Sequence, residues 1–181
     1  MTKGGLNITM QSFIKIILFV LLISFSSFSV GASTSEFFDE FLGDFQEELE
    51  VAKEDGKKAI VLFFELDECP FCHWMKKNVL NQDSVHKFYK KNFKIYAVDI
   101  EGDIEITDFK GKLTTEKQFS LKQFRVRATP VIAFIDLEGN LLTKFTGRVS
   151  SVKEFNLLGK YVLSKAYKTM RFSKYKRKNK K

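Results

Sequence analysis

Cys69-Pro70-Phe71-Cys72 decides the fold of this chain, because it holds the only two cysteines of 181 residues and places them three positions apart. The continuously apolar run 59–64 precedes it, and the segment after it has the pattern of a helix. Residues three apart in the first turn of a helix lie on one face, so the two sulfurs can meet at disulfide distance. The spacing therefore predicts a redox-active disulfide at the start of a helix.

The two cysteines are expected to differ in reactivity. If Cys69 is the N-cap, Pro70 takes the first helical position, where its missing N–H costs nothing. The Cys69 thiol then lies near unpaired amide donors and the positive end of the helix dipole, which lower the pKa of a thiol. Cys69 is therefore the predicted nucleophile, and Cys72 the more buried thiol that resolves a mixed disulfide.

A zinc site, a structural disulfide and haem attachment are the other chemistries open to a cysteine pair. A zinc site needs about four ligands, and beyond the cysteines only His73 and His86 are available. A purely structural disulfide closing so short a loop would constrain the unfolded chain little. The stretch 69–73 also matches the C-x-x-C-H signature of c-type haem attachment, with His73 as the axial ligand. A haem carrier is the main alternative, but it would not require Thr129-Pro130 before a strand. We expect no cofactor and no metal.

Residues 36 to about 172 resemble a thioredoxin-fold protein, and they are most similar to the periplasmic SoxW-like and DsbE-like thioredoxins. The stretches that carry the resemblance are 63–65, 69–75, 98–100, 126–131, 136–140 and 145–147. The resemblance implies an α/β fold with a central mixed sheet flanked by helices and a small insertion, 101–114, before the proline segment. It also implies a cis bond at Thr129-Pro130 that faces the disulfide, although an ordinary strand-initiating proline is the alternative.

The resemblance also implies which residues contact substrate. They are Pro70, Phe71, Trp74, Thr129 and Pro130, with the backbone of residue 129 free to pair with a bound strand. Packing into the core is the other account of Trp74, although its large ring could shape a substrate groove.

The chain departs from the cytosolic thioredoxin pattern at the position of the buried proton-relay aspartate. Phe63 stands six residues before Cys69, where that family has the aspartate. Glu65, Asp67 or a water could act as the base for Cys72, and the sequence does not choose among them.

The N-terminus is typical of a secretory signal. Lys3 and Lys15 give it a positive charge without an acid, an apolar core follows, and residues 30–32 are small enough for a signal peptidase. We expect residues 1–32 to be removed and the protein to be periplasmic. The alternative is an uncleaved segment that anchors the protein to the membrane.

Charge divides the remainder into a domain and a tail. The chain carries +8, and +6 without residues 1–32. Residues 171–181 hold seven basic groups and no acid, so residues 33–170 carry a net charge of −1 and have the length of one domain. The tail is expected to be disordered, with contact to an anionic membrane surface as the alternative. We expect no nucleic-acid binding, and we expect the protein to be a monomer.

Periodicity and capping residues predict the order of elements. A helix capped by Ser33 or Ser35 should run to about Gly56, and Ser151 with Glu154 forms a capping box for the last helix. The expected strands are 59–64, 94–100, 131–136 and 141–146, and the other helices are 70–79, 84–92, 115–124 and 152–169.

These patterns favour an exported thiol–disulfide oxidoreductase acting through a Cys69 mixed disulfide. By resemblance it would be a reductase of disulfides in other exported proteins, supplied with electrons by a membrane carrier of the DsbD or CcdA kind. A disulfide oxidase of the same fold, a c-type haem electron carrier and a non-catalytic binding module are the alternatives.

Overall fold

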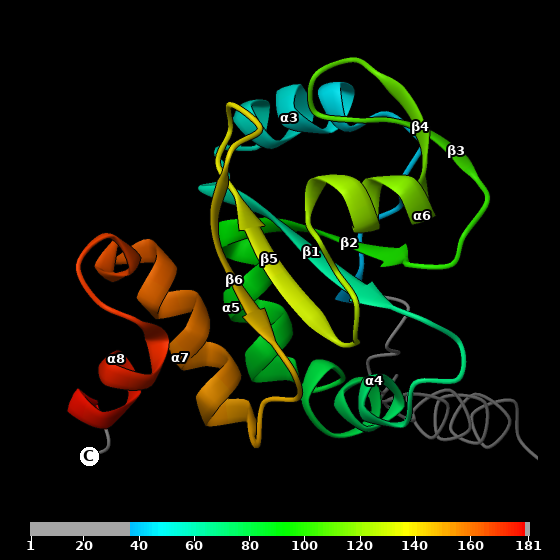
Figure 1. The fold of residues 1–181 in the computed structure, drawn as a ribbon. Helices are drawn as coiled ribbons and strands as arrows, with labels where there is room; N and C mark the ends of the chain where they lie inside the picture. Colours follow the sequence, from blue (N-terminus) through cyan, green and yellow to red (C-terminus); the bar gives the residue numbers. More distant parts are fainter. Residues whose placement is uncertain (1–36, 180–181) are drawn as a thin grey trace, which may run out of the picture. The chain divides into compact units, whose positions relative to one another are not determined.

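The computed structural model describes residues 37–179 (Figure 1). The predicted signal segment, 1–32, lies outside the described residues. Between residues 37 and 179, no helix has the length and apolar character needed to cross a bilayer.

The core of the fold is a mixed four-stranded sheet with the order β2-β1-β5-β6 (Figure 1). Its strands are β1 (Ala59–Glu65), β2 (Phe93–Asp99), β5 (Val131–Ile135) and β6 (Leu141–Thr146). β1 is parallel to β2 and antiparallel to β5, and β5 is antiparallel to β6. The predicted α/β class and the central mixed sheet are confirmed.

Strand β1 lies inside the sheet and is buried on both faces, which explains its continuous apolar run. Val61 and Phe63 pack into one hydrophobic core, and Leu62 and Phe64 pack into a second core on the opposite face. Side chains alternate along a strand, so neighbours in the sequence serve different cores. Helices supply the other half of each core and cover both faces of the sheet (Figure 1).

The helical elements follow the expected order. They are α3 (Phe45–Glu54), α4 (Pro70–Met75), α5 (Asp83–Asn92), α6 (Glu116–Gln118), α7 (Val152–Leu163) and α8 (Phe172–Lys178), with π-helical turns η1 (Lys76–Leu80) and η2 (Phe119–Gln123) and a 3-10 turn η3 (Ala166–Lys168). The insertion predicted at 101–114 forms most of a small antiparallel hairpin, β3 (Glu105–Thr107) with β4 (Leu113–Thr115), which ends one residue beyond it. Ser151 caps α7, since its hydroxyl accepts the N–H of Glu154 at 3.2 Å.

The long first helix predicted to end near Gly56 is wrong in its N-terminal part. α3 starts only at Phe45, because Gly43 adopts a positive φ of 97° and Asp44 caps the helix by accepting the N–H of Gln46 at 2.7 Å. Residues 39–42 are irregular instead, and they are held to β2 by Asp39, whose N–H donates to the Ile95 carbonyl at 2.7 Å and whose carboxylate accepts the Ile95 N–H at 2.7 Å.

The C-terminal segment also differs from the prediction, since residues 172–178 form helix α8 rather than a disordered tail. Phe172 and Tyr175 pack against the ring of Tyr161 in α7, with centroid distances of 5.5 and 5.2 Å. Lys176 forms an ion pair with Glu154 of α7 at 2.5 Å. The high charge of the segment hid two aromatic residues three apart, which is one face of a helix.

Candidate active site

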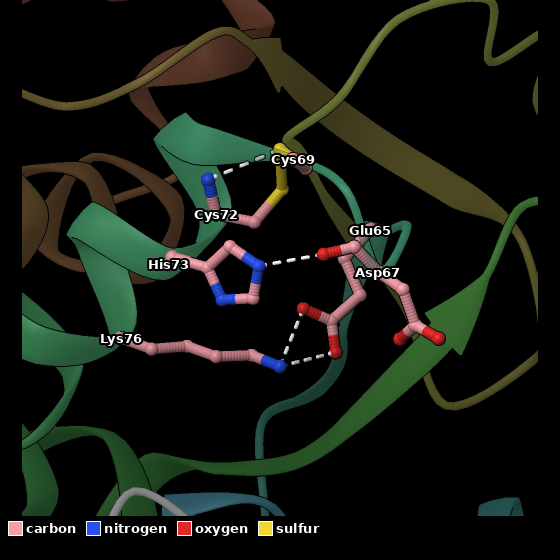
Figure 2. Close-up of a disulfide and its surroundings, with 6 residues drawn as sticks. All are labelled: Glu65, Asp67, Cys69, Cys72, His73 and Lys76. Atoms are coloured by element: carbon pink, nitrogen blue, oxygen red, sulfur yellow. Dashed lines mark hydrogen bonds and ion pairs between the residues drawn. A yellow bond between two sulfur atoms is a disulfide. The ribbon is translucent and has the colours of Figure 1, made fainter.

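Cys69 and Cys72 form a disulfide at the N-terminal end of α4 (Figure 2). Their Cα atoms are 5.2 Å apart. Cys69 is the N-cap residue with an extended backbone, and Pro70 occupies the first turn, as the sequence predicted. The N–H of Cys72 donates to the Cys69 sulfur at 3.1 Å. The helix terminus therefore presents a backbone donor to one sulfur of the pair.

Both sulfurs are largely shielded from solvent. Cys69 is 4% exposed and Cys72 is fully buried, with Met75 and Phe63 in the same hydrophobic core. Because both residues are buried, their exposure does not separate the attacking thiol from the resolving one. The roles of nucleophile and resolving thiol stay predictions.

The segment 129–130 lies at the same end of the sheet as the disulfide. The peptide bond between Thr129 and Pro130 is cis, as the resemblance implied. Val131, the next residue, pairs with Phe64 near the end of β1, from which the chain continues into α4. The carbonyl of Pro130 accepts the N–H of Gly147, and Thr129 is half-buried. Both figures show the start of β5 beside the N-terminal end of α4.

Phe71 and Trp74 lie under a cation supplied by another part of the chain. The guanidinium of Arg148 lies 4.2 Å from the ring centroid of Trp74 and 5.5 Å from that of Phe71. Phe71, between the two cysteines, is 55% exposed, while Trp74 is half-buried against the core. The expected packing of Trp74 and an exposed aromatic surface at the motif are thus both present.

The polar residues beside the disulfide are engaged with one another (Figure 2). The Glu65 carboxylate forms an ion pair with Lys76 at 2.6 Å. The Nε2 of His73 lies 2.6 Å from the Asp67 carbonyl oxygen. A carbonyl oxygen only accepts, so His73 donates to it through its Nε2 N–H. The Asp67 carboxylate points away from the sulfurs in Figure 2, and Phe63 provides no ionisable group.

Comparison with known proteins places this geometry in a family. The family model for a thioredoxin-like domain matches residues 45–163, which span both cysteines and Pro130. The chain belongs to the thioredoxin-like domain family. No curated protein matches its sequence at a significant level.

Solved structures agree with the fold of this thioredoxin-like domain. A thioredoxin-fold protein from Helicobacter pylori matches with a TM-score of 0.60 at 17% identity, over 80% of this chain and 92% of that one. A thioredoxin from Thermus thermophilus matches with a TM-score of 0.53 at 22% identity, over 67% of this chain and 85% of that one. At these identities the likeness concerns the fold alone.

The cysteines and His73 are arranged differently here from what c-type haem attachment requires. Haem attachment through C-x-x-C-H uses both cysteines and places the following histidine on the iron. Here the two sulfurs are bonded to each other, and His73 donates its Nε2 proton to the loop before the helix. Within residues 37–179, no three ligand-type side chains gather into a possible metal site.

Sequence patterns missed Arg148, the cation that covers the aromatic residues of the motif. It follows Gly147 after β6, far from the cysteines along the chain, and no spacing rule links it to them. Only the pairing of β6 with β5, and of β5 with β1, brings this loop to the disulfide end of the sheet. Arg148 joins the candidate site from tertiary structure alone.

Proposed function

We propose that this protein is an exported thiol–disulfide oxidoreductase that reduces disulfides in other exported proteins. The observation that carries the proposal is the Cys69–Cys72 pair at the start of α4, with the Cys72 N–H donating to the Cys69 sulfur at 3.1 Å. A donor aimed at this sulfur stabilises it as a thiolate, the form that attacks a disulfide.

The proposed reaction begins with the pair reduced. The Cys69 thiolate attacks one sulfur of a substrate disulfide, and the second substrate sulfur leaves with the electron pair and takes a proton from solvent. Cys72 then loses its proton to solvent and attacks the Cys69 sulfur, which releases the first substrate sulfur as a thiol. The substrate gains two electrons and two protons, and the pair becomes the disulfide of Figure 2. A dithiol carrier must return both electrons.

The reductase direction is supported by the motifs, which resemble those of SoxW-like and DsbE-like thioredoxins. The proposed electron source is a membrane carrier of the DsbD or CcdA kind.

Replacing one cysteine at a time tests the mechanism. Cys72→Ser should leave a nucleophile that forms mixed disulfides and cannot resolve them, so native partners accumulate as covalent adducts on non-reducing gels. Cys69→Ser is the matched control and should trap little. In alkylation of the two variants across a pH series, the variant that retains Cys69 should react faster at each pH. A faster reaction of Cys72 would reverse the assigned roles.

The direction of electron flow has its own measurement. The reduction potential of the pair should lie nearer that of thioredoxin, about −270 mV, than that of DsbA, about −120 mV. A value close to the second would keep the oxidoreductase chemistry and make the protein an oxidase.

Export is tested by mass spectrometry of the protein from its native host. The mature chain should begin at Ser33. A chain beginning at Met1 in the membrane fraction would make residues 1–32 an anchor instead of a cleaved signal.

A further inference from the structure

A basic groove lies between the end of β6, the start of α7 and helix α8. It has a volume of about 640 Å³, and the residues that line it include Phe145, Arg148, Phe172, Lys176 and Arg177. Phe145 and Phe172 meet edge to face with centroids 5.6 Å apart and give the groove an apolar surface. Cationic side chains lie around these rings.

Helix α8 is held firmly enough to form a wall of the groove. Its rings pack on Tyr161, and the Tyr161 hydroxyl donates to the Met170 carbonyl at 2.6 Å, just before α8 begins. Burial raises the pKa of the Tyr161 hydroxyl, which keeps it protonated as a donor. The groove therefore depends on a docked helix rather than on a loose basic tail.

The groove carries positive charge that no neighbouring group neutralises. Its acidic residue, Glu154, is 8% exposed and accepts hydrogen bonds from Ser150 and Lys176. Burial alone would raise the pKa of Glu154, but these bonds outweigh it and the pKa is lowered. Glu154 thus stays ionised and balances Lys176. Within residues 37–179, Arg148 and Arg177 form no ion pair.

Arg148 connects the groove to the disulfide. The same guanidinium that lines the groove lies over Trp74 and over Phe71 of the motif. A polypeptide that meets Cys69 and runs toward α8 would therefore pass Phe71, Arg148 and Arg177 in turn. Acidic side chains on such a polypeptide would meet cations, and basic side chains would be repelled.

We propose that this groove binds an acidic segment beside the target cysteine of a substrate protein. The inference rests on the proposed function and specifies the substrate class of the same site. A polypeptide fits better than an anionic membrane, because a strand can enter a concave groove and reach Arg148. A flat bilayer would meet the outward lysines of α8, such as Lys174 and Lys178, which are exposed.

Binding is tested without redox chemistry by using cysteine-free peptides and the mature, oxidised protein. Trp74 is the only tryptophan of the chain, and it lies under Arg148, so its fluorescence reports events in the groove. A glutamate-rich peptide should give a saturable change, and the matched glutamine-rich peptide should bind much more weakly. Arg177→Gln should weaken binding of the acidic peptide about threefold to fivefold, the upper part of the range for one exposed ion pair.

Lys174→Gln is the matched control, because it removes the same charge from the same helix but at a residue that does not line the groove. It should weaken binding by less than about 1.5-fold. Equal effects of the two variants, or equal binding of the two peptides, would overturn the proposal. Binding to vesicles containing anionic lipid that both variants weaken equally, without a preference for the acidic peptide, would point to a membrane surface instead.

A kinetic experiment separates this inference from the proposed function. Two peptides with the same disulfide, one flanked by glutamates and one by glutamines, are supplied to the reduced wild-type protein. The acidic peptide should have a higher kcat/KM, and added salt should reduce its advantage. Equal kcat/KM values would overturn the proposal that the groove binds acidic segments and would leave the proposed oxidoreductase function unaffected. A third outcome is a protein that reduces neither peptide but still binds the acidic peptide in the fluorescence test. That result would contradict the proposed oxidoreductase function and leave the proposed peptide binding unaffected.

Discussion

Replacing Phe172 by alanine tests whether α8 is docked on the domain in solution. Loss of a fully buried phenylalanine costs about 3–5 kcal/mol of unfolding free energy. Phe172 is half-buried, and its ring meets Phe145 at 5.6 Å and Tyr161 at 5.5 Å. Half of the full value gives a loss of about 1.5–2.5 kcal/mol. For a domain of about 150 residues, at about 2–4 °C per kcal/mol, the loss corresponds to a fall in Tm of about 3 to 10 °C.

The assay is urea unfolding of the mature protein, together with limited trypsin digestion. In the wild type, Lys174 and Arg177 lie in the helix and should be cut slowly. Phe172→Ala should release α8 and expose these sites to rapid cleavage. The control is Leu42→Ala, because Leu42 is 78% exposed and its loss should change stability by less than about 0.5 kcal/mol.

An unchanged unfolding free energy in Phe172→Ala would refute the docked helix. Rapid trypsin cleavage at Lys174 in the wild type would do the same. Either result would restore the disordered tail that the charge of residues 171–181 predicted, and would remove one wall of the basic groove.

Two further substitutions examine buried polar groups. Tyr89→Phe removes the hydroxyl that donates to the Phe155 carbonyl at 2.7 Å but keeps the stacked rings, so urea unfolding should show a loss of about 1 kcal/mol; no loss would mean that the bond is broken in solution. Burial raises the pKa of Glu116. The backbone N–H of Asp99 donates to the Glu116 carboxylate and lowers this pKa, whereas the negative charge of Asp99 raises it, and the net shift is upward. The folded state thus favours protonated Glu116, and ionisation lowers stability as pH rises above the ordinary carboxyl range of about 4.3. Glu116→Gln should therefore stabilise the protein at pH 7 but not at pH 4, and a gain independent of pH would contradict this cause.

The sequence predicted those elements that depend on residues close together in the chain. The run 59–64 is apolar throughout because β1 is buried on both faces, and this pattern is visible in the sequence. The cysteine spacing, Pro70 and the cap at Ser151 likewise depend on neighbours within a turn or two of helix. Each of these features appears in the structure.

Features that depend on distant contacts could not be predicted. The apolar periodicity from Phe37 to Ala52 fits one helix, but Asp39 pairs with Ile95 of β2 and Gly43 turns the chain before α3. Arg148 reaches the motif only through the order of strands in the sheet. The lysines of residues 171–181 concealed the aromatic face of α8, whose partner Tyr161 lies on another helix.

The short connection between β1 and α4 makes the position of Cys69 depend on the register of β1, that is, on which of its side chains face each core. Only residues 66–68 separate the strand from the N-cap, and the Cys69 N–H already donates to the Leu66 carbonyl. A one-residue slip of β1 would exchange the side chains that face the two cores and move the sulfur by about 3.3 Å along the strand direction. The β3–β4 hairpin has no such link to the sulfurs, although Ile106 and Phe109 are buried in the second core. The chain should therefore reject added or lost residues at 66–68 and accept them in the exposed turn 110–112 of the hairpin, where a change of length leaves the sulfur in place.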